Sequence, residues 1–332
     1  MEIVPGVHQF KLPLPPGASL DHVNAYLVES NKGNLLIDTG YDTAEAFAAL
    51  RDSLRSRGFG FKDISQIVVT HIHPDHYGQA DKLRQISGAS LALSGIEERL
   101  IQPRYEKMHN LLKEVRLVLA RNGVPEDELS GLTEAALAVK PFVGLASPDI
   151  KLEDGDKVPL SSSQFTVLLT PGHSPGHICL YEPERKFLFS GDHVLPDIFP
   201  HVGLHPQSGE NPLGDFFDSL QRLEKLEVNF VFPGHGSVFS GFKLRVSELL
   251  YHQEQRQLAI IKVVRDEPKT AYQIANEIPW MPAGEVVSFD KLSTFDRRLA
   301  VMEALAHLKL LLVEGRAERI TKENVDFYWA GG

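Results

Sequence analysis

The stretch that decides the interpretation of this sequence is HIHPDH at residues 71–76, which is separated by one threonine from the apolar run IVV at 67–69. Three imidazoles and a carboxylate within six residues form a dense set of metal ligands. Side chains alternate along an extended backbone, so His71 and His73 can point the same way. Pro74 favours a turn, which lets the last two residues of the stretch approach from a second direction. The stretch therefore predicts ligands for two metal ions.

Three further ligand-type residues, His173, Asp192 and His235, each come just after a short apolar run that predicts a β-strand. In a layered α/β protein the ends of neighbouring strands gather along one edge, so distant residues can meet there. A single histidine is most often structural. That interpretation does not account for HIHPDH combined with three strand-end ligands. We therefore expect all of these residues to form one site that holds both metal ions.

The chain divides into segments of different periodicity. Short apolar runs alternate with turn signals up to about residue 95 and again to about residue 240, which predicts an α/β domain over 1–244. Residues 96–146 carry apolar side chains at three- and four-residue spacing, which predicts a helical insertion. After that domain come three helical patterns and a hairpin with its turn near 322–324. This order is that of a winged-helix module, so we predict a second domain over 245–332.

Composition narrows the class of protein. The 332 residues are 42% hydrophobic and 23% charged, as in ordinary globular chains, and the net charge of −10 opposes nucleic acid and anionic membranes as partners. The single cysteine, Cys179, excludes an intramolecular disulfide. We see neither a secretory leader nor a membrane-spanning run. We therefore expect a cytoplasmic protein that acts on a small molecule.

Five motifs together resemble the metallo-β-lactamase superfamily: LLIDTG with Asp38, HIHPDH, TPGHSPGH, SGD and FPGHG, in this order between about residues 20 and 240. The resemblance implies a four-layer αββα sandwich of two mixed sheets between helices, with metals along one edge. The predicted winged helix makes the chain similar to the lactamase-beta-2-like proteins, which are relatives of hydroxyacylglutathione hydrolases. The fold class we predict is thus α/β, with a helical insertion and a small C-terminal domain.

The resemblance also implies a role for each ligand-type residue. Asp38 would orient a ligand loop. Ligands that are all nitrogen or oxygen suit zinc, and iron or manganese would also be accepted. The implied ligands are His71, His73 and His173 for the first metal, Asp75, His76 and His235 for the second, and Asp192 as the bridge between the two.

This metal pair predicts a reaction. Two cations about 3.5 to 4 Å apart lower the pKa of a shared water towards about 7 and polarise the oxygen under attack. We expect a metal-bridging hydroxide to attack an ester or thioester carbonyl, with Asp75 and Asp192 in the catalytic centre. A thiolate leaving group departs without needing a proton. The sequence shows no basic clamp for a glutathione moiety.

Four further side chains each have two interpretations. His177 is a ligand or, as we favour, a residue that supports the site from behind. His193 faces away from the metals if the backbone is extended at Asp192. His201 lies in a loop rich in Pro and Gly, where it is exposed or contacts substrate. Tyr77 donates a hydrogen bond to substrate or, as we favour, is structural.

Two alternative functions stay open. The same metals cleave phosphodiesters in other proteins, and a winged helix suits a protein that binds nucleic acid. Against this, the segment from Arg245 onward contains twelve basic and thirteen acidic residues, whereas nucleic-acid modules usually carry an excess of basic ones. Flavodiiron proteins normally carry glutamate where this chain has His73, and they add a flavodoxin domain that we do not find. A mononuclear iron site like that of persulfide dioxygenases is not excluded by ligands. A structural tail or a homodimer surface is a third role for the C-terminal domain.

Overall fold

The computed structural model describes residues 1–15, 20–159, 164–281 and 285–330. The first sheet has seven strands, in which the first four run antiparallel and the rest pair in parallel from β4 onward. Its strands, in spatial and chain order, are β1 (Glu2–Val4), β2 (Val7–Pro13), β3 (His22–Val28), β4 (Asn34–Ile37), β5 (Ile64–Val68), β6 (Ser90–Ser94) and β7 (Ile150–Leu152).

The second sheet has five strands in the order β12-β11-β10-β9-β8, antiparallel except for the parallel pair β11 and β12. The parallel pair requires a crossover, which the helix α7 (Pro212–Glu224) provides. The strands of this sheet are β8 (Lys157–Pro159), β9 (Gln164–Leu169), β10 (Ile178–Glu182), β11 (Phe187–Gly191) and β12 (Phe230–Pro233).

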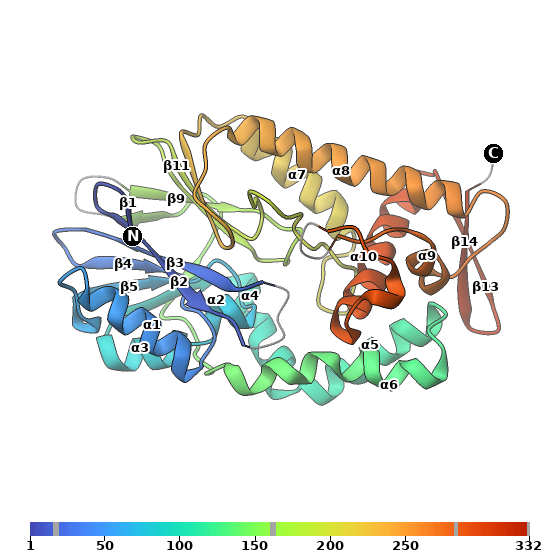
Figure 1. Cartoon of the computed structure of the whole chain (residues 1–332), viewed down its shortest axis with the longest axis horizontal. Coiled ribbons are helices and arrows are strands. Elements are labelled where there is room, and N and C mark those ends of the chain that lie inside the picture. Colours follow the sequence, from blue (N-terminus) through green and yellow to red (C-terminus); the bar gives the residue numbers. More distant parts are fainter. Residues whose placement is uncertain (16–19, 160–163, 282–284, 331–332) are drawn as a thin grey trace.

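The two sheets pack face to face, with helices on the outer faces (Figure 1). Phe165, Phe189 and Phe232 are fully buried between the sheets, and the last two stack with ring centroids 4.5 Å apart. The helices α1 (Ala44–Arg55) and α3 (Ala80–Ser87) cover the first sheet, while α7 and α8 (Phe242–Val263) cover the second. The predicted αββα sandwich is confirmed.

Local signals in the sequence explain where these helices begin and end. The Thr43 side chain accepts a hydrogen bond from the Ala46 N–H and so caps α1, and Glu45 adds a favourable charge in its first turn. The helix α3 ends at Gly88, whose φ of +80° only glycine adopts freely. These ends set the lengths of the loops that lead to the strands.

The insertion and the C-terminal segment are both helical. In the C-terminal segment three helices are followed by a two-stranded hairpin, and its turn, Glu323-Asn324, has φ of +51° and +64° as a type I′ turn requires. The elements are α4 (Gly95–Ile101), the π-helical turn η2 (Gln102–Glu106), α5 (Met108–Arg121), α6 (Glu126–Glu134), the 3-10 turn η3 (Ala135–Phe142), α8, α9 (Ala271–Glu277), α10 (Thr294–Val313), β13 (Glu318–Lys322) and β14 (Val325–Trp329).

These two helical segments share one apolar core. Val115 and Leu119 of α5 pack in the same cluster as Ile260 of α8, Leu308 of α10 and Tyr328 of β14. Figure 1 shows α5 and α6 beside α10 at the end of the molecule away from the sheets. The insertion is therefore joined to the C-terminal segment by packing, although 98 residues (147–244) separate them in the chain. Across the described ranges, no helix has the length and apolar character that crossing a membrane requires.

Candidate metal centre

Strand ends from both sheets meet at one edge of the sandwich. Asp38 follows β4, and the stretch 71–76 follows β5 in the first sheet. In the second sheet, His173 follows β9, Asp192 follows β11, and His235 follows β12. His73 is the N-cap of the short helix α2 (Pro74–Tyr77), and this turn directs the carboxylate of Asp75 towards the same edge. All seven ligand-type residues singled out from the sequence lie in two neighbouring clusters.

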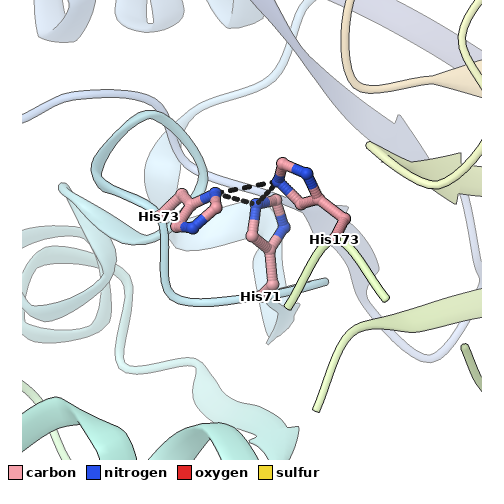
Figure 2. Close-up of side chains that lie close together, drawn as sticks. All are labelled: His71, His73 and His173. Atoms are coloured by element: carbon pink, nitrogen blue, oxygen red, sulfur yellow. Dashed lines mark hydrogen bonds between the residues drawn. The ribbon is translucent and has the colours of Figure 1, made fainter. Parts of the chain in front are cut away.

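The first cluster consists of His71, His73 and His173, whose nitrogens face one another (Figure 2). The Nε2 atom of His71 lies 2.9 Å from His73 Nδ1 and 3.2 Å from His173 Nε2. His73 Nδ1 and His173 Nε2 are 2.9 Å apart. Nitrogens around a tetrahedral zinc ion at about 2.05 Å lie about 3.3 Å from each other. Three ring nitrogens at nearly this spacing fit one cation.

The second cluster consists of Asp75, His76, Asp192 and His235. The His235 Nε2 atom lies 3.2 Å from Asp75 Oδ2 and 3.4 Å from Asp192 Oδ2. The His76 Nε2 atom lies 3.6 Å from Asp75 Oδ2 and 3.3 Å from Asp192 Oδ1. Two imidazoles and two carboxylates therefore converge on one point, which suits a divalent cation.

Asp192 belongs to both clusters by geometry. Its Oδ2 atom is also 3.7 Å from the Nε2 atom of His173 in the first cluster. Asp192 Oδ1 and His76 Nε2 are buried and have no hydrogen-bond partner among the described residues. Unsatisfied buried polar atoms are costly, and a bound cation would satisfy both. The residues present therefore fit the divalent metal that such a donor set would hold.

Four imidazole rings of the centre turn the same nitrogen, Nε2, towards the clusters because each Nδ1–H is engaged elsewhere. His173 donates from Nδ1 to the carbonyl oxygen of His201 at 2.8 Å, and His235 donates from Nδ1 to that of His22 at 2.9 Å. These bonds hold a proton on Nδ1, so Nε2 is the nitrogen that faces the cluster and can bind a cation once it carries no proton. The direction of each ring is thus set before any ion binds.

Asp38 orients rings of both clusters. Its carboxylate accepts from His76 Nδ1–H at 2.8 Å, from the Thr70 N–H at 2.8 Å and from the Thr70 hydroxyl at 2.9 Å. The hydroxyl oxygen of Thr70 in turn accepts from the Nδ1–H of His71 at 3.1 Å. Asp38 is buried and has a φ of +59°, a conformation that costs energy outside glycine. The strained backbone aims one carboxylate at both ligand sets.

His177 supports the backbone of Asp192. Its Nε2 atom accepts from the Asp192 N–H at 3.1 Å, and its Nδ1–H donates to the Thr170 hydroxyl at 2.8 Å. Gly191, with a φ of +47°, makes this approach possible, because a Cβ there would lie 2.5 Å from the His177 ring. Both ring nitrogens of His177 are therefore used inside the protein.

The three other side chains for which the sequence left two interpretations open lie in different surroundings. His193 is fully buried against Phe216, and neither ring nitrogen has a partner in the described part of the chain. Tyr77 is fully buried, and its hydroxyl donates to the carbonyl of Ala146. The ring of His201 lies 3.4 Å from a carboxylate oxygen of Glu303. The contact of His201 with the ligand residue His173 is made by its backbone carbonyl and not by its ring.

Sequence reasoning missed Glu97, which connects two ligand loops. This fully buried carboxylate accepts from the Ile72 N–H at 2.9 Å and from the Gly176 N–H at 2.8 Å. It lies in the first helix of the insertion, where a glutamate usually faces solvent. No local pattern distinguishes it from the exposed acids around it, because its two partners lie elsewhere in the chain.

The two clusters differ in charge. Burial and the neighbouring imidazoles hold the pKa of His71 well below its ordinary value. Burial also opposes protonation of His235, but Asp192 and Asp75 raise its pKa to about 10. Burial would raise the pKa of Asp192, but His235 and His76 hold it well below its usual range. The first cluster thus offers neutral nitrogens, and the second offers ionised carboxylates together with imidazoles that release protons when a cation binds.

Comparison with known proteins agrees with this geometry. The sequence model of the Metallo-beta-lactamase superfamily matches residues 18–235. The chain therefore belongs to the metallo-beta-lactamase superfamily, whose members bind divalent metals, and the resemblance seen in its motifs is confirmed at this level.

Relatives extend the likeness beyond the matched segment. The chain is 26% identical to "Probable metallo-hydrolase YqjP" of Bacillus subtilis over 96% of its own length and 94% of that protein. It is 29% identical to "Acyl-coenzyme A thioesterase MBLAC2" of Gallus gallus, over 68% of this chain and 76% of that one. The metallo-beta-lactamase family protein TTHA1429 from Thermus thermophilus superposes with a TM-score of 0.83 at 29% identity, covering 99% of each chain.

Proposed function

We propose that this protein is a dinuclear metal-dependent hydrolase of small-molecule esters or thioesters. The observation that carries the proposal is Asp192, whose two oxygens lie within 3.7 Å of ligand nitrogens from both clusters. A carboxylate shared in this way suits a pair of ions held side by side. His71, His73 and His173 would hold one ion, and Asp75, His76 and His235 would hold the other.

Bound divalent ions supply a water of lowered pKa and positive charge for the oxygen under attack. The chain's own residues prepare for this chemistry. Asp38 and the carbonyls of His22 and His201 accept from the Nδ1–H groups of three rings, so each of these rings turns its Nε2 towards the place where an ion would bind. His177 holds the Asp192 amide and so limits movement of the shared carboxylate. This arrangement needs no serine or cysteine nucleophile, and Cys179 is buried with a pKa raised to about 12 by burial.

The thioester assignment draws on the relatives. The chicken relative is named a thioesterase, and the Bacillus relative a metallo-hydrolase. A thiolate leaves without a proton donor, so a thioester would need no general acid beyond the ligands of this centre. Zinc is the metal we propose, since nitrogen and carboxylate ligands in these numbers suit it, with iron or manganese as substitutes.

The C-terminal segment, which we interpret as a winged-helix domain over 245–332, has a structural role in this proposal. Its third helix, α10, would be a reader of nucleic acid only if one face were free. Instead, α10 packs against α6, α7, α8 and α9, and half of its residues are buried. We propose a small-molecule substrate and a cytoplasmic location; a homodimer is compatible with this arrangement.

Metal analysis combined with a substrate panel tests the proposal. The panel contains an acyl-CoA, an acyl-glutathione, a lactone, a β-lactam and a bis-aryl phosphodiester. We expect two ions per chain and hydrolysis of an ester or thioester. The variants His73→Ala and Asp192→Ala should abolish hydrolysis with the circular dichroism spectrum unchanged, whereas His109→Ala, at an exposed histidine of α5, serves as the matched control.

Three results would contradict it. A metal-free preparation that is fully active would remove the basis of the mechanism. Cleavage of the phosphodiester alone would favour nucleic-acid chemistry. A single iron per chain with oxygen uptake would favour the dioxygenase alternative.

A further inference from the structure

The loop 201–209 connects the metal centre to the C-terminal segment. On one side, the carbonyl of His201 accepts the hydrogen bond that orients the ligand His173. On the other side, the N–H of Leu204 donates to the carbonyl of Met302 in α10 at 2.9 Å. Side chains of this loop are therefore held at a fixed place between the first cluster and α10.

The turn η2 of the insertion reaches the same loop. The hydroxyl of Tyr105 donates to the carbonyl of Ile72, which lies between two metal ligands. The preceding residue, Arg104, donates from Nε to the Gln207 side-chain oxygen at 3.0 Å. Arg104 is therefore held beside the centre by its own hydrogen bond to Gln207 and by the hydrogen bond of its neighbour Tyr105 to Ile72.

Hydrogen-bond donors gather here without acceptors. Gln207 is only 7% exposed, and its Nε2 has no partner among the described residues. The buried Nε of Arg298, on α10, is also unpartnered within the described ranges. Neither Arg104 nor Arg298 forms an ion pair with any carboxylate in the part of the chain that the structure covers. His205 accepts the Gln207 N–H at its Nδ1 (3.1 Å), which leaves Nε2–H as a further donor.

We propose that Arg104, His205, Gln207 and Arg298 form an anion-binding cluster that holds a carboxylate or phosphate group of the substrate. The geometry points to an acceptor, because the Nε of Arg298 and the Nε2 of Gln207 are buried without partners among the described residues. No described carboxylate pairs with either guanidinium group, although the two lie close enough that burial and the charge of Arg104 together lower the pKa of Arg298. Guanidinium groups bind both oxyanions through paired hydrogen bonds. The placement of this group on the substrate rests on the proposed function.

The electrostatics of the cluster agree with its geometry. Burial and the positive charge of Arg104 lower the pKa of Arg298 to about 10. Two such charges without a counter-ion repel each other, and a bound anion relieves the repulsion. The whole chain has a net charge of −10, so a locally positive cluster is the part of it that would attract an anionic ligand. The substrate would bind with its acyl carbonyl at the metals and its anionic end at the cluster.

Matched thioesters test the substrate side. The same acyl group is presented on N-acetylcysteamine, which is neutral, on 3-mercaptopropionate, which carries a carboxylate, and on coenzyme A, which carries phosphates. We expect the kcat/KM ratio of an anionic over the neutral thioester to fall about 10- to 100-fold in Arg298→Gln and in Arg104→Gln. Whichever anionic thioester loses more identifies the group that is bound.

The control is the next residue along α10. Arg297 forms an ion pair with Glu128 at 2.9 Å, so Arg297→Gln changes the net charge equally without touching the cluster. It should leave the kcat/KM ratio unchanged. Thermal unfolding separates binding from structure, since removing a repelled charge should not lower the melting temperature of Arg298→Gln. An equal loss of the kcat/KM ratio in Arg298→Gln and in the control Arg297→Gln would overturn the proposal.

A binding measurement keeps this proposal separate from the proposed function. Calorimetry with inorganic phosphate and with succinate is performed on the Asp192→Ala chain, where the shared metal ligand is gone. We expect one of the two anions to bind and to lose at least tenfold in affinity when Arg298→Gln is added. If no thioester is cleaved but this binding is found, the cluster stands and the hydrolase proposal fails. If neither anion binds, the cluster is refuted.

Discussion

The substitution Asp38→Asn tests how the protons of the ligand rings are placed. Asparagine has the shape of aspartate, but it has only one acceptor oxygen where the native carboxylate has two. The native Oδ1 accepts from the Thr70 N–H, and Oδ2 accepts from His76 Nδ1–H and the Thr70 hydroxyl. Either orientation of the new amide therefore places its NH₂ group against a buried N–H.

The size of the effect follows from these contacts. If the amide oxygen stays with the Thr70 N–H, the NH₂ group faces His76, whose proton must move to Nε2, the nitrogen that faces the metal. If the amide turns, the backbone N–H loses its acceptor. Leaving a buried donor unsatisfied costs about 1 to 3 kcal/mol, and losing such an outer contact weakens metal binding about 10- to 100-fold. We expect that loss chiefly at the second site, to which His76 belongs.

The assay is a zinc titration against a competing chelator, with metal content measured at each step. Glu97→Gln is the matched control, because Glu97 is also a buried carboxylate that accepts from N–H groups, but both of these belong to the backbone and neither to a ligand ring. The control should lower stability, and any loss of affinity should fall on the first site, whose ligand loops Glu97 joins, and not on the second. If Asp38→Asn binds both ions as tightly as the native protein, the reasoning about ring protons is wrong.

Three further predictions concern stability and packing. Gly234→Ala should reduce metal content to one ion or none while the fold is kept, since a Cβ there would lie 2.2 Å from Asp192 Oδ1; plasma emission spectrometry measures it, and an unchanged content would contradict the prediction. Burial lowers the pKa of His307 to about 3, below the ordinary 6.5, so the unfolded chain binds the proton first and stability is lost as the pH falls below about 6.5. His307→Leu should therefore reduce the drop in unfolding free energy between pH 7.5 and pH 5 by about 2 kcal/mol in urea titrations, and an unaltered drop would count against a buried neutral ring. Removal of metal by a chelator should lower the melting temperature. Zinc restored at about 100 times its Kd should raise the free energy of unfolding by about 2.7 kcal/mol. An equal melting temperature with and without metal would speak against binding to the folded state.

Much of the architecture was predictable because its signals are local. Apolar runs closed by Gly, Pro or charge predicted the strands that precede His173, Asp192 and His235, and three-four spacing predicted the helices of the insertion. The ends of those strands lie at one edge in a layered fold, which is why ligand-type residues far apart in sequence were expected to meet.

The remaining features depend on contacts between distant segments, for which the sequence has no periodic signal. The support given by Glu97 depends on two backbone N–H groups in separate loops. The approach of Arg104 to Arg298 joins the insertion to the last long helix, and each arginine alone resembles a solvated one. For His173 and His235, the nitrogen that faces the cluster depends on a backbone carbonyl, a group that every residue carries and that the sequence therefore cannot single out.

The apolar core shared by α5, α6 and the C-terminal helices has a consequence for engineering and for divergence among homologues. Deleting either segment would leave the apolar side of the other in water, so a truncated protein should aggregate. A chimera that takes new substrate range from a homologue has to exchange both pieces together, as one inherited unit.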